Sequence, residues 1–214
     1  MTESATGLIL RTRPLTETSL IVHWLTPDLG RLATVAKGAR RPKSSFRGKL
    51  DLFYLCDFSF ARSRRSELHN LREASLRDPH ATLRRELGWL QQASYCTALI
   101  TQTTETETPL QELFTLLQGL LAALPQHPPQ PLTLFAFEMK LLAILGLNPN
   151  LADARLTPGT RQILEKCLTS DWPELFRFKL SPAQTAELRQ FLHGFLIYHL
   201  GKVPAGRHTS VSDL

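Results

Sequence analysis

The pattern of hydrophobic and polar positions changes near residue 78. Before it, short β-branched or aromatic runs alternate with Gly, Pro and Asp turns, which is typical of β-strands. Five short strands favour a small closed barrel, with the five-stranded OB-fold as the leading candidate, although periodicity alone does not separate it from an SH3-like barrel. The predicted strands cover residues 7–13, 18–25, 31–36, 52–60 and 67–74.

After residue 78 the apolar positions follow a helical spacing. Helix starts are predicted where a capping side chain precedes proline, because proline at the first helical position has no N–H to leave unpaired. Gln111 and Gln184 also predict capping boxes, and Gly201 predicts the end of the last helix. The four predicted starts are Asp78-Pro79, Thr108-Pro109, Thr157-Pro158 and Ser181-Pro182.

Residues 132–145 are apolar on nearly every side, which indicates a helix at the centre of a bundle. Glu138 interrupts this run, and we expect it to pair with a basic group or to reach the edge of the bundle rather than act in catalysis. His199 is expected to be a buried residue on the apolar face of the last helix. The chain is thus predicted to be an α+β protein, with a five-stranded OB-fold domain over residues 1–77 and an all-helical domain over residues 78–214.

Positive charge is concentrated in the N-terminal part. Residues 1–87 hold 16 Lys and Arg against 9 Asp and Glu, whereas the remainder holds 9 against 10. A surplus confined to one part indicates that this part binds a polyanion, most commonly nucleic acid. An anionic membrane is a weaker candidate, because no basic amphipathic helix is present.

All but one of the candidate binding residues fall in two clusters, and Arg13 lies apart from both. Residues 31–49 contain seven basic residues and no acid, together with Gly and Ser groups suited to phosphates. A second cluster lies between the fourth and fifth predicted strands, and Phe46 is expected to be exposed enough to stack on bases. The residues predicted to bind nucleic acid are Arg13, Arg31, Lys37, Arg40, Arg41, Lys43, Arg47, Lys49, Arg62, Arg64 and Arg65.

The sequence gives little support for nucleotide binding by a P-loop or for nuclease activity. Residues 38–44 differ from a phosphate-binding P-loop because Pro42 stands before the lysine, and no clustered acids suit a two-metal nuclease. We therefore predict no catalytic residue, cofactor or metal. Cys56, Cys96 and Cys167 are expected to be buried thiols. The polar start lacks a signal peptide and no long apolar run is present, so a cytoplasmic protein is expected.

Several segments resemble the RecO family of bacterial DNA repair and recombination mediators. The likeness covers most of the chain, and its most specific part is residues 35–41. It rests on residues 7–14 (GLILRTRP), 17–20 (ETSL), 35–41 (VAKGARR), 50–53 (LDLF), 137–142 (FEMKLL) and 198–202 (YHLGK).

This resemblance implies an N-terminal OB-fold that binds single- and double-stranded DNA, with contacts at Lys37, Arg40, Arg41 and Lys43. It implies annealing of complementary strands and, with RecR, loading of RecA onto DNA coated by single-strand-binding protein (SSB). The helical domain would bind the acidic SSB tail, for which Lys140 and Lys202 are candidates. Such a protein would associate with the nucleoid in the cytoplasm.

One departure concerns zinc. Many family members have four cysteines after the central helix, whereas residues 148–159 contain none, so no zinc site is expected.

Two other functions remain open on the residues alone. An OB-fold module for structured RNA or the ribosome would show the same charge pattern, and competition between DNA and RNA separates the two. A nucleic-acid-processing enzyme is disfavoured, because the acid cluster that it needs is missing.

Overall fold

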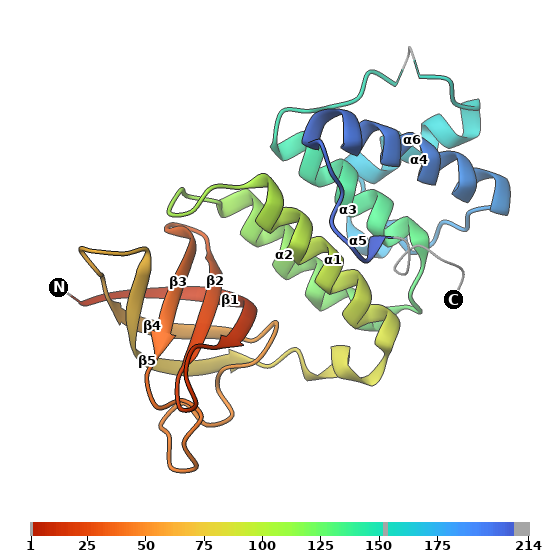
Figure 1. Ribbon diagram of the computed structural model, residues 1–214. Coiled ribbons are helices and arrows are strands. Elements are labelled where there is room, and N and C mark those ends of the chain that lie inside the picture. The colour runs from red at the N-terminus through yellow and green to blue at the C-terminus, as the bar shows by residue number, and fades with distance from the viewer. Residues whose placement is uncertain (1, 152–153, 208–214) are drawn as a thin grey trace. The chain divides into compact units, whose positions relative to one another are not determined.

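The computed structural model describes residues 2–151 and 154–207 and has the α+β architecture expected from the sequence (Figure 1). It divides into two compact units. The first contains the residues up to Ala81 together with Thr104–Gln118, and the second contains Thr82–Thr103 together with the residues from Gly119 onward. The first unit therefore includes a segment that lies after the first long helix, besides the predicted strands.

Five strands close into a barrel in the order β1-β2-β3-β5-β4, with β4 pairing back to β1. All neighbouring strands are antiparallel except β3 and β5, which are parallel. This closed five-stranded barrel agrees with the predicted OB-fold. The strands are β1 (Thr2–Pro14), β2 (Leu20–Thr26), β3 (Gly30–Ala36), β4 (Leu55–Ala61) and β5 (Leu68–Asp78).

An aromatic stack forms the centre of the barrel core. The rings of Trp24 and Phe58 lie 4.0 Å apart at an interplanar angle of 12°, and Phe58 in turn stacks on Phe60. The indole Nε1 of Trp24 donates to Oγ1 of Thr34 at 2.8 Å, so its polar group is satisfied although the side chain is fully buried. Along β3 and β4, buried side chains alternate with partly exposed ones, as expected for strands with one side in the core.

A strap formed by residues 104–110 lies against the barrel within the first unit. The N–H of Glu107 donates to the carbonyl of Arg31 at 2.8 Å, and that of Leu110 donates to the carbonyl of Pro27 at 2.9 Å. Gly30 adopts a left-handed φ of 65°, and a Cβ added there would lie 1.8 Å from the carbonyl oxygen of Thr108. The close approach of the strap thus requires glycine at position 30.

The second unit is built around α3 (Pro131–Ile144), which packs against four other helices, α1, α4, α5 and α6. Residues 132–139, 141 and 142 are all buried, as the continuous apolar pattern predicted. The other helices are α1 (Leu87–Thr103), α2 (Gln111–Ala123), which extends across both units, α4 (Pro158–Thr169), α5 (Trp172–Leu175) and α6 (Pro182–Leu200), with short 3₁₀ turns η1 (Ala81–Arg85) and η2 (Leu124–Gln126).

Two of the four predicted helix starts are confirmed. Thr157 accepts a hydrogen bond from the N–H of Thr160 at the start of α4. Ser181 and Gln184 form a reciprocal capping box at the start of α6, and Gly201 ends that helix with a φ of 73°.

The other two helix starts were wrong. Asp78 is the last residue of β5, where it pairs with Leu55, and its carboxylate accepts from the N–H of His80. Thr108 lies three residues before α2, and its hydroxyl donates to the carbonyl of Thr106. The predicted capping box at Gln111 is therefore absent, because the strap, rather than a helix turn, continues through Thr108.

The charge on Glu138 is compensated, as expected for a buried carboxylate. Glu138 is completely buried in α3, and the guanidinium of Arg207 binds its two oxygens at 2.7 and 2.9 Å. The hydroxyl of Tyr95 donates to Oε1 of Glu138 at 2.6 Å. Burial, followed by the negative charge of Glu138, raises the pKa of Tyr95, so this donor keeps its proton.

Two further expectations concern single side chains. His199 was expected to be buried, but it is exposed on α6 with its ring 4.3 Å from that of Phe195. The prediction was wrong because the described residues leave the side of α6 that carries His199 exposed. Cys56, Cys96 and Cys167 are buried thiols, as predicted.

Two properties of the described residues bear on membrane insertion and on metal binding. None of these helices is both long enough and apolar enough to cross a membrane. Within the same ranges, no group of three His, Cys, Asp or Glu side chains could hold a metal ion. Ala152 and Asp153, which fall in the segment where zinc ligands were considered, lie outside the described residues, as do residues 208–214.

We predict that Glu138→Ala lowers the free energy of unfolding by about 3–5 kcal/mol, because it leaves the Arg207 guanidinium buried without a counter-charge. Urea unfolding followed by circular dichroism measures this. Lys166→Ala is the matched control: it breaks an exposed ion pair with Glu174 and is expected to cost less than about 1 kcal/mol. Equal effects of the two substitutions would contradict a structural role for the buried pair.

Candidate nucleic-acid interface

The basic segment, residues 37–49, connects β3 to β4 and consists of consecutive turns. In each of four turns the N–H of one residue donates to the carbonyl three positions earlier, at 3.0–3.2 Å. The segment opens with Gly38, whose φ of 70° places it in the left-handed region. The turns satisfy backbone groups that would otherwise need water, and they give the segment a defined shape. The donors are Arg41, Ser44, Arg47 and Lys49.

Phe46 anchors the basic segment in the barrel. Its side chain is only 8% exposed and belongs to the same hydrophobic cluster as Val22, Trp24 and Phe58. The expectation that Phe46 is exposed for base stacking was therefore wrong. Local sequence offered no contrary signal, because its neighbours are polar and its burial comes from strands that are distant in the chain.

Hydrogen bonds also hold both ends of the basic segment to the rest of the barrel. At its start, the backbone N–H of Arg40 donates to the carbonyl of Thr18 at 3.0 Å, and its Nη1 donates to that of Thr16 at 3.0 Å. At its end, the thiol of Cys56 donates to the carbonyl of Lys49 at 3.4 Å. Burial, followed by the nearby Asp57, raises the pKa of Cys56 to about 11, so this thiol remains a neutral donor near neutral pH.

The basic segment contains six cationic residues. Lys37, Arg41 and Lys43 are exposed and form no ion pair with any described residue. Arg47 is also exposed, and its Nη1 donates to the carbonyl of Pro42 at 3.4 Å. Since no acid occurs between residues 37 and 49, the segment presents uncompensated positive charge to solvent.

Two of the predicted binding residues instead hold the strap. Arg31 is half-buried, and its Nε donates to Oγ1 of Thr104 at 2.7 Å while its Nη2 donates to the Thr104 carbonyl. Arg62 pairs with Glu3 at 2.8 Å and with Glu107 of the strap at 2.5 Å. Both guanidinium groups already have acceptors, so they are less available to phosphates than the cations of the basic segment.

The other predicted cations lie on separate parts of the barrel. Arg64 and Arg65 are exposed in the loop between β4 and β5, and Arg13 is exposed near the end of β1. Sequence reasoning missed Arg11, which the strand register places opposite His23. Burial lowers the pKa of His23, and Arg13, Arg11 and Arg31 lower it further. Only the register could reveal that these charges share one side of the sheet.

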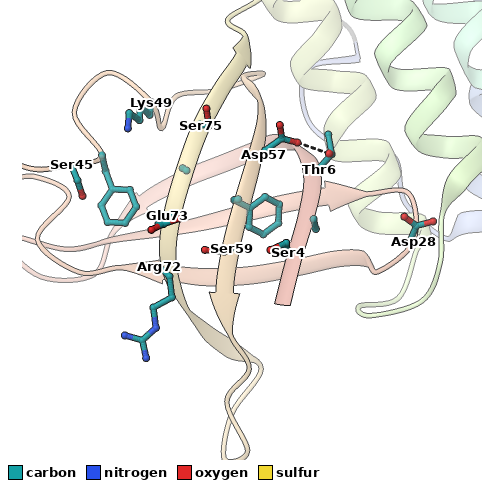
Figure 2. A pocket seen from close by; sticks show the side chains of 14 residues that line it. Ser4, Thr6, Asp28, Ser45, Lys49, Asp57, Ser59, Arg72, Glu73 and Ser75 are labelled. Atoms are coloured by element: carbon teal, nitrogen blue, oxygen red, sulfur yellow. Dashed lines mark hydrogen bonds between the residues drawn. The ribbon is translucent and has the colours of Figure 1, made fainter. Parts of the chain in front are cut away.

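A wide concavity on the barrel has a different character. This cavity, of about 790 Å³, is lined by residues of β1, β4, β5 and the basic segment. Figure 2 shows Ser4, Ser59 and Ser75 around it, with Thr6 donating to Asp57 at 2.6 Å. This bond, together with the ion pair to Arg77, lowers the pKa of Asp57. The lining acids Asp28, Asp57 and Glu73 offset its cations Lys49 and Arg72, so the basic segment remains the stronger site for a polyanion.

The two lysines predicted to bind a protein partner differ in setting. Lys140 is half-buried, and its ammonium donates to the carbonyls of Ser170 at 2.7 Å and Leu168 at 3.3 Å. Burial lowers its pKa. Lys202 is exposed, and its backbone carbonyl accepts from Nε2 of Gln102 at 2.6 Å. Lys202 is therefore the more accessible of the two.

Comparison with known proteins gives matches along most of the chain. Residues 1–80 match the family model "Recombination protein O N terminal", and residues 90–154 and 152–208 match "Recombination protein O C terminal". The chain is 34% identical over 236 residues to a protein of Anaeromyxobacter sp. (strain K) named DNA repair protein RecO, covering 94% of this chain and 93% of that protein.

Two further relatives carry the same name. The relative from Bacillus pumilus (strain SAFR-032) is 29% identical over 209 residues, covering 92% of this chain and 79% of that protein. The relative from Rhodopirellula baltica is 34% identical over 143 residues. That alignment covers 67% of this chain and 53% of the relative, so the match spans about half the length of that protein.

We predict that Phe46→Ala lowers the free energy of unfolding by about 3–5 kcal/mol, the usual cost of removing a buried phenyl ring. Lys43→Ala, three residues away in the same segment but exposed, is expected to change it by less than about 0.5 kcal/mol. Urea unfolding monitored by tryptophan fluorescence compares the two variants. A Phe46→Ala protein as stable as the wild type would show that the ring does not anchor the segment.

Proposed function

Because the chain belongs to the RecO family of DNA repair proteins, we propose that it binds single- and double-stranded DNA through the basic segment and anneals complementary strands. In cells it would help load RecA, with RecR, onto DNA coated by SSB. The observation that carries the DNA-binding proposal is the anchored run of six cations without an acid. The runner-up function is binding of structured RNA by the same surface.

Strand annealing needs no bond chemistry. Two DNA strands repel each other through their phosphates, and a surface that neutralises some of these charges lowers the repulsion between them. Backbone contacts of this kind are tolerant of sequence, which suits a protein that brings any two complementary strands together. We therefore propose no catalytic residue and no cofactor.

In this proposal the predicted residues differ in how directly they bind phosphates. Lys37, Arg40, Arg41 and Lys43 bind phosphates directly, and Arg47 and Lys49 continue the same surface. Arg13, Arg64 and Arg65 extend it to neighbouring loops and strands. Arg31 and Arg62 contribute chiefly by holding the strap, because their guanidinium groups already bind Thr104, Glu3 and Glu107.

The helical unit is proposed to bind protein partners, among them the acidic tail of SSB. Lys202 is exposed and offers a cation for that tail, whereas the ammonium of Lys140 is occupied by carbonyl groups. A protein with these partners would act in the cytoplasm, at the nucleoid.

We predict that the triple variant Arg40→Ala, Arg41→Ala and Lys43→Ala weakens DNA binding at least tenfold and lowers the slope of log affinity against log salt by about 2–3. Fluorescence anisotropy across a salt series measures both quantities. The control triple Arg155→Ala, Arg177→Ala and Lys179→Ala removes the same charge from exposed positions of the helical unit. Equal losses in both variants would indicate a general charge effect and contradict the assigned surface.

Annealing of SSB-coated complementary oligonucleotides, without nucleotide, tests the proposed function itself. We expect the protein to accelerate annealing, with the acceleration falling steeply as salt rises. Competition between single-stranded DNA and RNA of equal length decides between the leading function and the RNA alternative. Strand cleavage in magnesium or manganese would overturn the proposal that the protein makes and breaks no covalent bond.

A further inference from the structure

A second, smaller pocket opens directly on the basic segment. It has a volume of about 340 Å³ and lies between that segment and the start of β2. Its apolar lining comes from Leu20, Ala39, Leu50, Pro42 and the remaining exposed edge of Phe46. Three arginines, Arg40, Arg41 and Arg47, complete the lining, together with Gly48.

This combination of groups differs from the rest of the basic surface. A site that binds only phosphates needs cations and N–H donors, and it has no use for apolar side chains. Here apolar side chains and cations line one pocket, and no acidic residue is among the described residues that line it. A nucleotide matches both parts, since its base presents a flat apolar face and its phosphates carry the negative charge.

Two of the three arginines of this pocket are also pre-oriented. The guanidinium of Arg40 is held by the carbonyl of Thr16 at 3.0 Å, and that of Arg47 by the carbonyl of Pro42 at 3.4 Å. Each keeps other N–H groups for a ligand, because a guanidinium carries five donors. At Gly48, a Cβ would meet nothing within 4 Å, so this part of the lining is open.

We propose that this pocket receives one unstacked nucleotide of a bound strand, with its base against the apolar side chains and its flanking phosphates on Arg40, Arg41 and Arg47. The inference rests on the proposed nucleic-acid binding and adds a base-dependent contact to it. A duplex keeps its bases stacked and paired, so it uses only the phosphate contacts. The pocket therefore makes the protein favour strands with accessible bases over duplexes and over backbones without bases.

The test compares three probes of equal length: oligothymidylate, the same sugar–phosphate chain made entirely of abasic sites, and a duplex. We expect the wild type to bind oligothymidylate roughly five- to tenfold more tightly than the abasic chain, which corresponds to one base contact. Ala39→Leu fills the pocket without altering charge. It is expected to reduce this ratio to about one, leaving duplex affinity and the salt slope unchanged.

Two further variants make the experiment decisive. Ala186→Leu makes the same change at an exposed position of α6 and is expected to keep the wild-type ratio. If Ala39→Leu loses duplex binding as well, and has thus disturbed the fold, Gly48→Asn takes its place. Asparagine tolerates the left-handed φ of 72° at that position and adds a side chain at the open rim.

The outcomes separate this inference from the proposed function. A ratio of about one in the wild type, with normal duplex binding, would overturn the nucleotide pocket and leave DNA binding intact. Absence of binding to all three probes would overturn both. A wild-type ratio that survives pocket filling would place the base contact elsewhere and overturn the assignment. Loss of the ratio in the filled variant alone supports it.

Discussion

Burial of the Phe46 ring in the barrel offsets the repulsion among the cations that surround it in the sequence. Complete burial of such a side chain contributes about 1.5–3 kcal/mol, whereas two exposed charges a few ångströms apart repel by only about 1 kcal/mol in water. Burial of the ring therefore outweighs the repulsion within any one pair of these exposed cations. With the ring in place, the flanking turns project lysine and arginine side chains outward at fixed positions, and both proposed binding modes depend on that order.

Features set by neighbouring residues could be predicted, and features set by distant ones could not. The caps at Thr157 and Ser181 depend on side chains within three residues, and both predictions were confirmed. Asp78 and Thr108 carry the same local signal, but strand pairing and contact with the barrel prevail there. The barrel itself followed from short β-branched and aromatic runs separated by turn residues, a pattern that lies within each stretch of neighbouring residues.

In the candidate site, too, the features set by neighbouring residues could be predicted and those set by distant residues could not. The cations of the basic segment could be found by counting charges, because nothing nearby in the sequence neutralises them. Arg31 and Arg62 looked equivalent in the sequence, yet their acceptors on the strap are 73 and 45 residues away. The smaller pocket on the basic segment combines residues from β2 with residues from both ends of that segment, so no local sequence pattern predicts it.

The pairing of Glu138 with Arg207 has a consequence for synthesis of the chain. These partners are 69 residues apart, so on a ribosome the carboxylate of α3 is made well before the group that neutralises it. At roughly 5–20 residues per second, the delay is from about 3 to about 14 seconds. During that interval the helical unit lacks the counter-charge of its central helix, whereas all the strands of the barrel have already been made. The barrel can thus be complete while the helical unit still lacks the Arg207 guanidinium that neutralises Glu138.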